Sequence, residues 1–214
     1  MLESDFIPAA ESRSGVSRRL LIGLHGLGDS IEGYRWMPGA LQLPWLNYLL
    51  INVPDEYYGG FSWYDYTLED ISAGVKRSRE MLFQLLDAQR AKGFPTGQTT
   101  LFGFSQGCLM TIETAARYPH LLAGVVGISG YVCQPEKLLK ELSPVALRQR
   151  FLVTHGIEDP LIPYDTSSKH FAMLKNAGMN IRFHAFHKAH TITEEELELM
   201  REFIRAGYAD VVGA

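Results

Sequence analysis

The sequence TTLFGFSQGCLMTIETAARYP, residues 99–119, joins an apolar run to a run with helical periodicity through one serine, Ser105. Glycines stand two residues before and two residues after this serine, which gives the pattern G-x-S-x-G. A serine at a sharp strand-to-helix turn needs such neighbours because larger side chains would collide there. The serine oxygen would then project above a sheet, at a helix N-terminus that favours negative charge. On the motif alone, a glycine-rich helix entry with Ser105 as N-cap is an equally good interpretation.

The rest of the chain alternates short apolar runs with longer amphipathic runs. The apolar runs predict strands, and the runs with apolar residues three and four apart predict helices, of which the last has Thr193 as N-cap. Strands that alternate with helices imply a mostly parallel sheet covered on both faces, a doubly wound three-layer α/β fold. Functional residues of such a fold lie in loops after the strands. The predicted strands are 18–25, 46–54, 98–104, 121–129, 150–155 and 180–186, and the predicted helices are 67–91, 106–118, 165–177 and 191–207.

The composition predicts one globular domain, 1–214, in which 1–16 is an N-terminal extension or an edge strand. Hydrophobic residues make up 46% of the chain, enough for a large core. The net charge is −4 without a block of Lys and Arg, so we expect no nucleic-acid partner. We find no signal peptide and no apolar run long enough for a membrane span. Cys108 and Cys133 are expected as buried thiols of a cytoplasmic protein.

A serine nucleophile needs a base, and the base needs an acid that orients it. In this fold class the chain order is serine, acid, histidine. Asp159 follows the predicted strand 150–155 and precedes Pro160, which restricts its backbone, so Asp159 is the candidate acid. Glu158 is its nearest competitor. His155 precedes the acid, so we expect it to pack or to form hydrogen bonds rather than to act as the base.

The candidate base is His190, which lies in the loop directly before the last predicted helix. His187 follows the same predicted strand and is its competitor, whereas His170 and His184 fall within a predicted helix and a predicted strand. A lone histidine is more often solvated than catalytic. The order Ser105, Asp159, His190, with each residue after its own strand, favours catalysis here.

A tetrahedral intermediate also needs two N–H donors for its oxygen. One donor is expected to be the N–H of Gln106, and the other that of Leu27 in the glycine-rich loop LIGLHGLGDS, 21–30. This loop lacks both G-x-G-x-x-G and the Walker lysine, so it does not predict nucleotide binding.

Five segments, which span about residues 18–206, together resemble the phospholipase/carboxylesterase family of α/β-hydrolases, which includes the acyl-protein thioesterases. They are LHGLGDS (24–30), FSWYD (61–65), GFSQG (103–107) with ISGYV (128–132), HGIEDPLIP (155–163) and the histidine loop at 187–190. The resemblance implies an α/β-hydrolase without a large cap domain. It also implies Ser105 as nucleophile, Asp159 as acid, His190 as base, and Leu27 and Gln106 as oxyanion donors, and no cofactor or metal.

The resemblance further implies a small-molecule ester or thioester as substrate. The segment NVPDEYYGGFSWYD is shorter than in the thioesterases and rich in tyrosine, which favours esters of small or medium acyl chains. Trp63 lies in this segment, which borders the acyl site in the family, and is therefore a candidate substrate contact. Ala189 stands where the family usually has a glycine before the histidine.

Two other functions share the predicted fold. A noncatalytic module of this fold would bind a small ligand or a protein, and loss of a triad residue would favour it. A serine peptidase would use the same residues on amides, and a panel of peptide substrates separates it from an esterase. The sequence is also compatible with a homodimer that covers the sheet edge or the mouth of the site.

Overall fold

The fold is built on one seven-stranded sheet. The computed structural model describes residues 2–10, 17–53 and 55–208. The strand order is β1-β3-β2-β6-β7-β8-β9, and all neighbours are parallel except β1, which is antiparallel to β3. The mostly parallel sheet predicted from the sequence is confirmed. The strands are β1 (Glu3–Ile7), β2 (Leu20–Leu24), β3 (Asn47–Asn52), β6 (Thr99–Phe104), β7 (Gly124–Ile128), β8 (Phe151–Gly156) and β9 (Ile181–Phe186).

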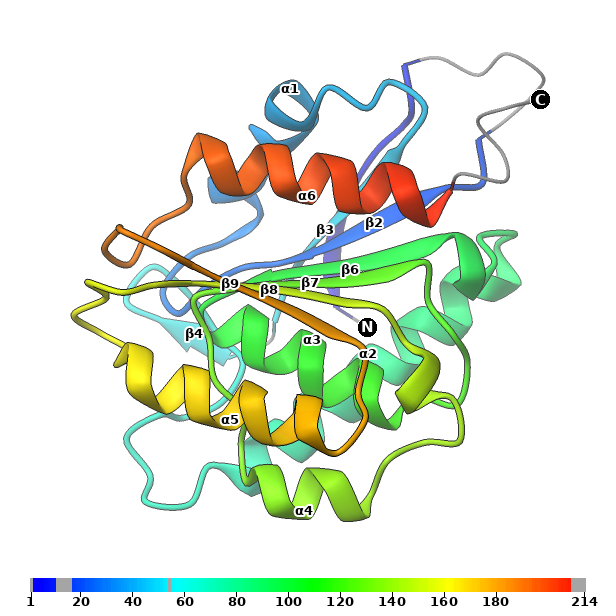
Figure 1. Cartoon of the computed structure of the whole chain (residues 1–214). Coiled ribbons are helices and arrows are strands. Elements are labelled where there is room, and N and C mark those ends of the chain that lie inside the picture. Colours follow the sequence, from blue (N-terminus) through cyan, green and yellow to red (C-terminus); the bar gives the residue numbers. More distant parts are fainter. Residues whose placement is uncertain (1, 11–16, 54, 209–214) are drawn as a thin grey trace.

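Helices cover both faces of this sheet, as Figure 1 shows. The helices are α1 (Met37–Leu41), α2 (Ser72–Ala91), α3 (Gln106–Arg117), α4 (Pro135–Lys140), α5 (Tyr164–Asn176) and α6 (Glu194–Gly207). Helices α2 to α5 lie on one face, and α1 and α6 lie on the other. Leu20, Ile22 and Leu24 of β2 pack into the core of the first face, whereas Leu21 packs into the core of the second. Because both faces are buried, the central strands are continuously apolar, as the sequence pattern predicts.

The start of the last helix is as predicted. Thr193 accepts a hydrogen bond from the backbone N–H of Glu196, and the Glu196 carboxylate accepts one from the backbone N–H of Thr193. This reciprocal pair satisfies two donors that the first turn of a helix leaves free. It also fixes the point at which the chain leaves the preceding histidine loop.

The expected helix at 67–91 is wrong at its start, because α2 begins at Ser72. Asp65 accepts hydrogen bonds from the N–H and hydroxyl of Thr67, and Asp70 accepts one from the N–H of Ser72. Such local bonds compete with helical backbone bonds and hold the segment in turns. Leu68, which the periodicity places on a buried face, is therefore 56% exposed.

A small hairpin that the sequence pattern did not reveal lies beside the sheet. It consists of β4 (Asp55–Tyr57) and β5 (Gly60–Ser62), and its turn has positive φ at both Tyr58 and Gly59. Positive φ at both turn residues is the geometry that matches the twist of two-residue hairpins. The short helices α1 and α4 were also not expected.

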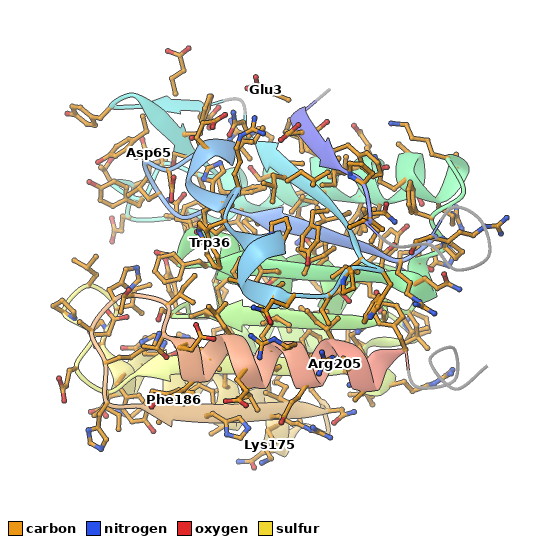
Figure 2. All side chains as sticks on the ribbon, turned by 90° about the horizontal axis from the view of Figure 1, so that it is seen from above. Glu3, Trp36, Asp65, Lys175, Phe186 and Arg205 are labelled. Atoms are coloured by element: carbon orange, nitrogen blue, oxygen red, sulfur yellow. The ribbon has the colours of Figure 1, made fainter. Side chains whose placement is uncertain are left out.

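The loops that follow the parallel strands gather at one end of the molecule. Figure 1 shows the hairpin (cyan), the β8–α5 loop (yellow) and the β9–α6 loop (orange) at this end. In the view over α6 in Figure 2, Phe186, which ends β9, and Asp65, which follows the hairpin, lie at the same end. Of the predicted segment 1–16, Glu3–Ile7 forms the edge strand β1, and 11–16 lies outside the described residues. None of the described helices combines the length and hydropathy that a bilayer crossing requires.

Candidate active site

Ser105 lies in a strained turn between β6 and α3. Its backbone has φ 56° and ψ −117°, a region that residues other than glycine rarely adopt. Its N–H donates to the carbonyl oxygen of Ile128, at the end of the neighbouring strand, over 2.9 Å. Ser105 occupies the N-cap position, but within the described chain its hydroxyl forms no capping hydrogen bond. The N-cap interpretation therefore does not account for the serine side chain.

The two glycines of the motif are required by close backbone contacts. A Cβ on Gly103 would lie 2.2 Å from the carbonyl oxygen of Gly107, and a Cβ on Gly107 would lie 2.3 Å from that of Leu24. Neither oxygen can move without displacing its strand or helix. The turn therefore packs α3 against β6 and β2 more tightly than any side chain allows.

Gly107→Ala is expected to destabilise the protein by about 3 kcal/mol or more, because its Cβ would overlap the Leu24 carbonyl. The free energy of unfolding from a denaturant titration measures this loss. Gly97→Ala is the matched control, because a Cβ on Gly97 would have no neighbour within 4 Å. A control that falls as far as Gly107→Ala would show that overlap at the turn is not the cause.

Asp159 is placed by the loop after β8, and its carboxylate is fully occupied. One oxygen, Oδ1, accepts the backbone N–H of Leu161 and of Ile162, both over 2.9 Å. The other, Oδ2, lies 2.7 Å from Nδ1 of His190. Burial opposes ionisation of Asp159, but the Ile162 N–H, the His190 ring and the Leu161 N–H outweigh it and lower its pKa. The group is therefore a carboxylate at neutral pH.

His190 lies between Asp159 and the serine turn. Because the Asp159 carboxylate only accepts, Nδ1 of His190 donates, and Nε2 remains to accept a proton. The ring packs against Phe104, the residue before Ser105, with centroids 4.8 Å apart. Ala189, where the family usually has glycine, is not among the described residues with positive φ, so alanine fits there without backbone strain.

The two competitors of these residues lie in solvent and pair with each other. His187 Nδ1 lies 3.7 Å from a carboxylate oxygen of Glu158, and the side chains are 84% and 66% exposed. By contrast, the Asp159 side chain is wholly buried and that of His190 is 12% exposed. The structure thus brings Asp159 and His190 together at the strand ends and leaves Glu158 and His187 outside.

His155 supports the acid loop from the buried side, in agreement with its expected role. Its Nε2 donates to the carbonyl oxygen of Ile162 over 2.9 Å and lies 3.6 Å from Asp159 Oδ2. Burial lowers the pKa of His155, so the ring is neutral at pH 7. It therefore fixes the loop that carries Asp159 without adding a charge beside it.

The glycine-rich loop after β2 lies directly against the serine turn. A Cβ on Gly26 would lie 3.4 Å from the Cβ of Ser105. Leu27, the next residue, is half-buried. Gln106 is the first residue of α3, so its N–H is one of those that a helix does not satisfy internally. Both expected oxyanion donors thus belong to the two backbone segments that meet at Ser105.

The Gln106 side chain, which sequence reasoning did not use, is buried behind the site. Its amide oxygen accepts the N–H of Trp63 over 3.0 Å, and its amide nitrogen donates to the carbonyl oxygen of Tyr64 over 3.1 Å. Gln106 therefore holds the segment after the hairpin against the start of α3.

Trp63 does not line an open site, contrary to its expected contact with substrate. The side chain is 0% exposed, and its indole N–H donates to the carbonyl oxygen of His25 over 2.9 Å. This bond anchors the base of the glycine-rich loop. Trp63, which the sequence suggested as a substrate contact, therefore supports the glycine-rich loop from the core.

A buried ion pair beneath the histidine loop was also missed. Lys188 Nζ lies 2.8 Å from Glu196 Oε1, and the two side chains are 3% and 0% exposed. Nothing in the sequence around Lys188 indicates that it is buried, and the sequence identified Glu196 only as part of a helix cap.

Cys108 and Cys133 are free and buried, and burial raises the pKa of the two thiols to about 12 and about 11.

Comparison with known proteins identifies the family of the chain. The family model described as Phospholipase/Carboxylesterase matches residues 7–207. The chain is 32% identical over 200 residues to acyl-protein thioesterase 1 of Schizosaccharomyces pombe, covering 86% of this chain and 88% of the relative. It is 27% identical to "Probable carboxylesterase Os04g0669500" of Oryza sativa subsp. japonica over 222 residues, covering 95% of this chain and 84% of the relative.

Among solved structures, that of esterase PE8 superposes with a TM-score of 0.85 at 28% identity and covers 96% of this chain and 98% of its own. The chain therefore belongs to the phospholipase/carboxylesterase family of α/β-hydrolases and is a hydrolase of the esterase and thioesterase kind.

Proposed function

We propose that the protein is a serine hydrolase that cleaves carboxylic esters, and also thioesters, through an acyl-enzyme on Ser105. The observation that carries this proposal is the buried hydrogen bond of 2.7 Å between His190 and Asp159, next to the serine turn. A histidine in solvent would have no fixed orientation as a base, and a carboxylate without a histidine partner would have no base to orient. The names of the relatives, thioesterase and carboxylesterase, support the same reaction class.

In the first step, Nε2 of His190 removes the hydroxyl proton of Ser105 as the oxygen attacks the substrate carbonyl. The Asp159 carboxylate accepts the Nδ1–H bond and stabilises the imidazolium that forms. His190 then protonates the leaving alcohol or thiol. A water molecule repeats the attack on the acyl-enzyme with His190 as its base, which releases the acid and restores the serine.

The negative oxygen of each tetrahedral intermediate is assigned to the backbone N–H groups of Leu27 and Gln106. Backbone donors held by a packed turn need no reorganisation during the reaction, and the loss of one such donor costs about 10²- to 10³-fold in kcat. The close approach of the Gly26 backbone to Ser105 and the place of Gln106 at the start of α3 support this assignment.

Esters of small or medium acyl chains are the proposed substrates. In Figure 1 the labelled helices lie above or below the sheet, whereas loops and the small hairpin lie at the end where the parallel strands lead into the acid and histidine loops. An open site of this kind favours substrates that need little enclosure. The buried free thiols of Cys108 and Cys133 favour a reducing compartment, and we propose the cytoplasm. A homodimer stays a prediction.

The first test is treatment of the purified protein with a fluorophosphonate, followed by intact and peptide masses. A single adduct on Ser105 is expected. Parallel assays use p-nitrophenyl esters from acetate to decanoate, the matching thioesters and a panel of peptide amides. Turnover of esters but not amides would exclude the peptidase. A folded protein with neither adduct nor turnover would instead be a noncatalytic binding module.

Asp159→Asn is expected to lower kcat by about 10⁴-fold. The carboxylate uses one oxygen for two backbone N–H groups and the other for His190, whereas asparagine has one oxygen only. Either the loop or the histidine then loses its acceptor. Steady-state kinetics with p-nitrophenyl acetate measure the effect.

Glu158→Gln is the matched control, because this neighbouring carboxylate is 66% exposed and contacts only His187 among the candidate residues. It should leave kcat unchanged. An Asp159→Asn enzyme with the wild-type rate would remove Asp159 from the triad.

A further inference from the structure

The Lys188 ammonium is buried beneath the histidine loop, and three acceptors surround it. Its Nζ lies 3.0 Å from Ser129 Oγ, 2.5 Å from the Thr191 carbonyl oxygen and 2.8 Å from Glu196 Oε1. An ammonium has three donors and no acceptor, so these contacts use all its protons. A lysine that was only carried by a surface loop would extend its charge into water instead.

The Glu196 carboxylate is equally well satisfied. Its Oε1 accepts the hydroxyl of Thr154 over 2.5 Å as well as the Lys188 ammonium, and its Oε2 accepts the N–H of Thr193 over 2.9 Å. A buried ion pair contributes to a stable fold only when hydrogen bonds also satisfy its remaining atoms. Both partners meet that condition here.

The Lys188–Glu196 pair contacts the three segments that carry or neighbour His190, Ser105 and Asp159. Lys188 and Thr191 stand on either side of His190, so their hydrogen bond closes a short loop around the base. Ser129 follows Ile128, whose carbonyl oxygen holds the N–H of Ser105. On the acid side, Thr154 belongs to β8, the strand that leads into the loop of Asp159.

We infer that Lys188 is a positioning residue for the proposed reaction: its ammonium, paired with Glu196, fixes the loop of His190 relative to the strand ends that carry Ser105 and Asp159. The inference rests on the proposed function for its kinetic effect. An apolar pair of similar volume often stabilises a fold as well as a buried ion pair does. The polar pair differs in imposing one geometry, and a shift of about 1 Å at a reacting group can cost about 10²-fold in rate.

The test uses the double variant Lys188→Met/Glu196→Gln. Removing both charges avoids an uncompensated buried charge, and glutamine at the third helix position still serves the cap with Thr193. We expect a folded protein whose kcat falls about 10²-fold while KM changes little. The proton resonance of the His190–Asp159 hydrogen bond, measured by one-dimensional NMR, should broaden or disappear.

The matched control is Glu113→Gln/Arg117→Met. This pair is also buried, with side chains 3% and 9% exposed, but it lies along α3 and contacts none of the triad residues. Because Glu113 also pairs with Arg79 and Arg117 also pairs with Glu141, this variant should lower stability at least as much as the double variant does, while kcat and the His190 resonance stay as in the wild type. A milder variant, Ser129→Ala, removes one anchor of Lys188 and keeps both charges, so a smaller fall in kcat is expected.

The outcomes separate the two proposals. A folded double variant with wild-type kcat and an unchanged resonance would overturn the role of Lys188 and leave the proposed function intact. Should the double variant not fold, an unchanged kcat and resonance in Ser129→Ala would overturn it equally. A wild-type protein without turnover or fluorophosphonate adduct would overturn the proposed function, and the resonance alone would then decide whether Lys188 holds His190 against Asp159.

Discussion

Ser105→Ala is expected to lower kcat for p-nitrophenyl esters by roughly 10⁴- to 10⁶-fold and to abolish the fluorophosphonate adduct. The hydroxyl is the only functional group of this side chain, and the thiol of Cys108, three residues further along, is fully buried. The residual rate would come from substrate binding and the backbone donors. Steady-state kinetics and intact mass measure the two effects.

Ser168→Ala is the matched control, because Ser168 is a partly exposed serine of α5 whose hydroxyl donates only to a carbonyl oxygen of its own helix. It should keep the wild-type rate and the adduct. Circular dichroism and thermal melting of Ser105→Ala should match the wild type, because alanine leaves the same backbone in place. Substantial turnover in a folded Ser105→Ala protein would show that another residue carries the acyl group.

His190→Ala is expected to lower kcat by at least about 10³-fold, because the serine hydroxyl then has no base and the leaving group no acid. The effect should appear in kcat rather than in KM, since His190 acts mainly in the transition state. The measurement is the initial rate of p-nitrophenyl butyrate hydrolysis over substrate concentrations from well below KM to saturation, which gives kcat and KM separately.

His187→Ala provides the comparison within the same loop. His187 is 84% exposed and pairs only with the exposed Glu158 among the candidate residues, so its removal should leave kcat unchanged. The opposite result, loss of activity in His187→Ala and retention in His190→Ala, would assign the base to His187. It would also mean that the loop rearranges when substrate binds, because the Asp159 contact belongs to His190 in this structure.

Much of the fold follows from patterns that are local in the sequence. Continuous apolar runs mark strands that are buried on both faces, and their alternation with amphipathic runs implies parallel crossovers. Local hydrogen bonds set the cap at Thr193, so its residues alone indicate it. The start of α2 was mispredicted because Asp65 and Asp70 form side-chain bonds that apolar periodicity does not register.

Chain order and short motifs were enough to predict the candidate site residues from the sequence. Positions 103 and 107 must be glycine because a carbonyl oxygen lies where a Cβ atom would be. The G-x-S-x-G motif is the sequence pattern that results from this requirement. The preference for Asp159 over Glu158 and for His190 over His187 came from order and resemblance. The structure adds a physical difference, since one pair is buried and hydrogen-bonded and the other is solvated.

By itself, the sequence determined the layered α/β architecture, the turn at Ser105 and the short set of candidate acids and bases, because each depends on neighbours along the chain. Only the tertiary structure decided that Trp63 supports the glycine-rich loop and that Lys188 pairs with Glu196. Burial and ion pairing between different segments depend on distances in space. An aromatic residue or a lysine has the same letter whether it faces water, substrate or the core.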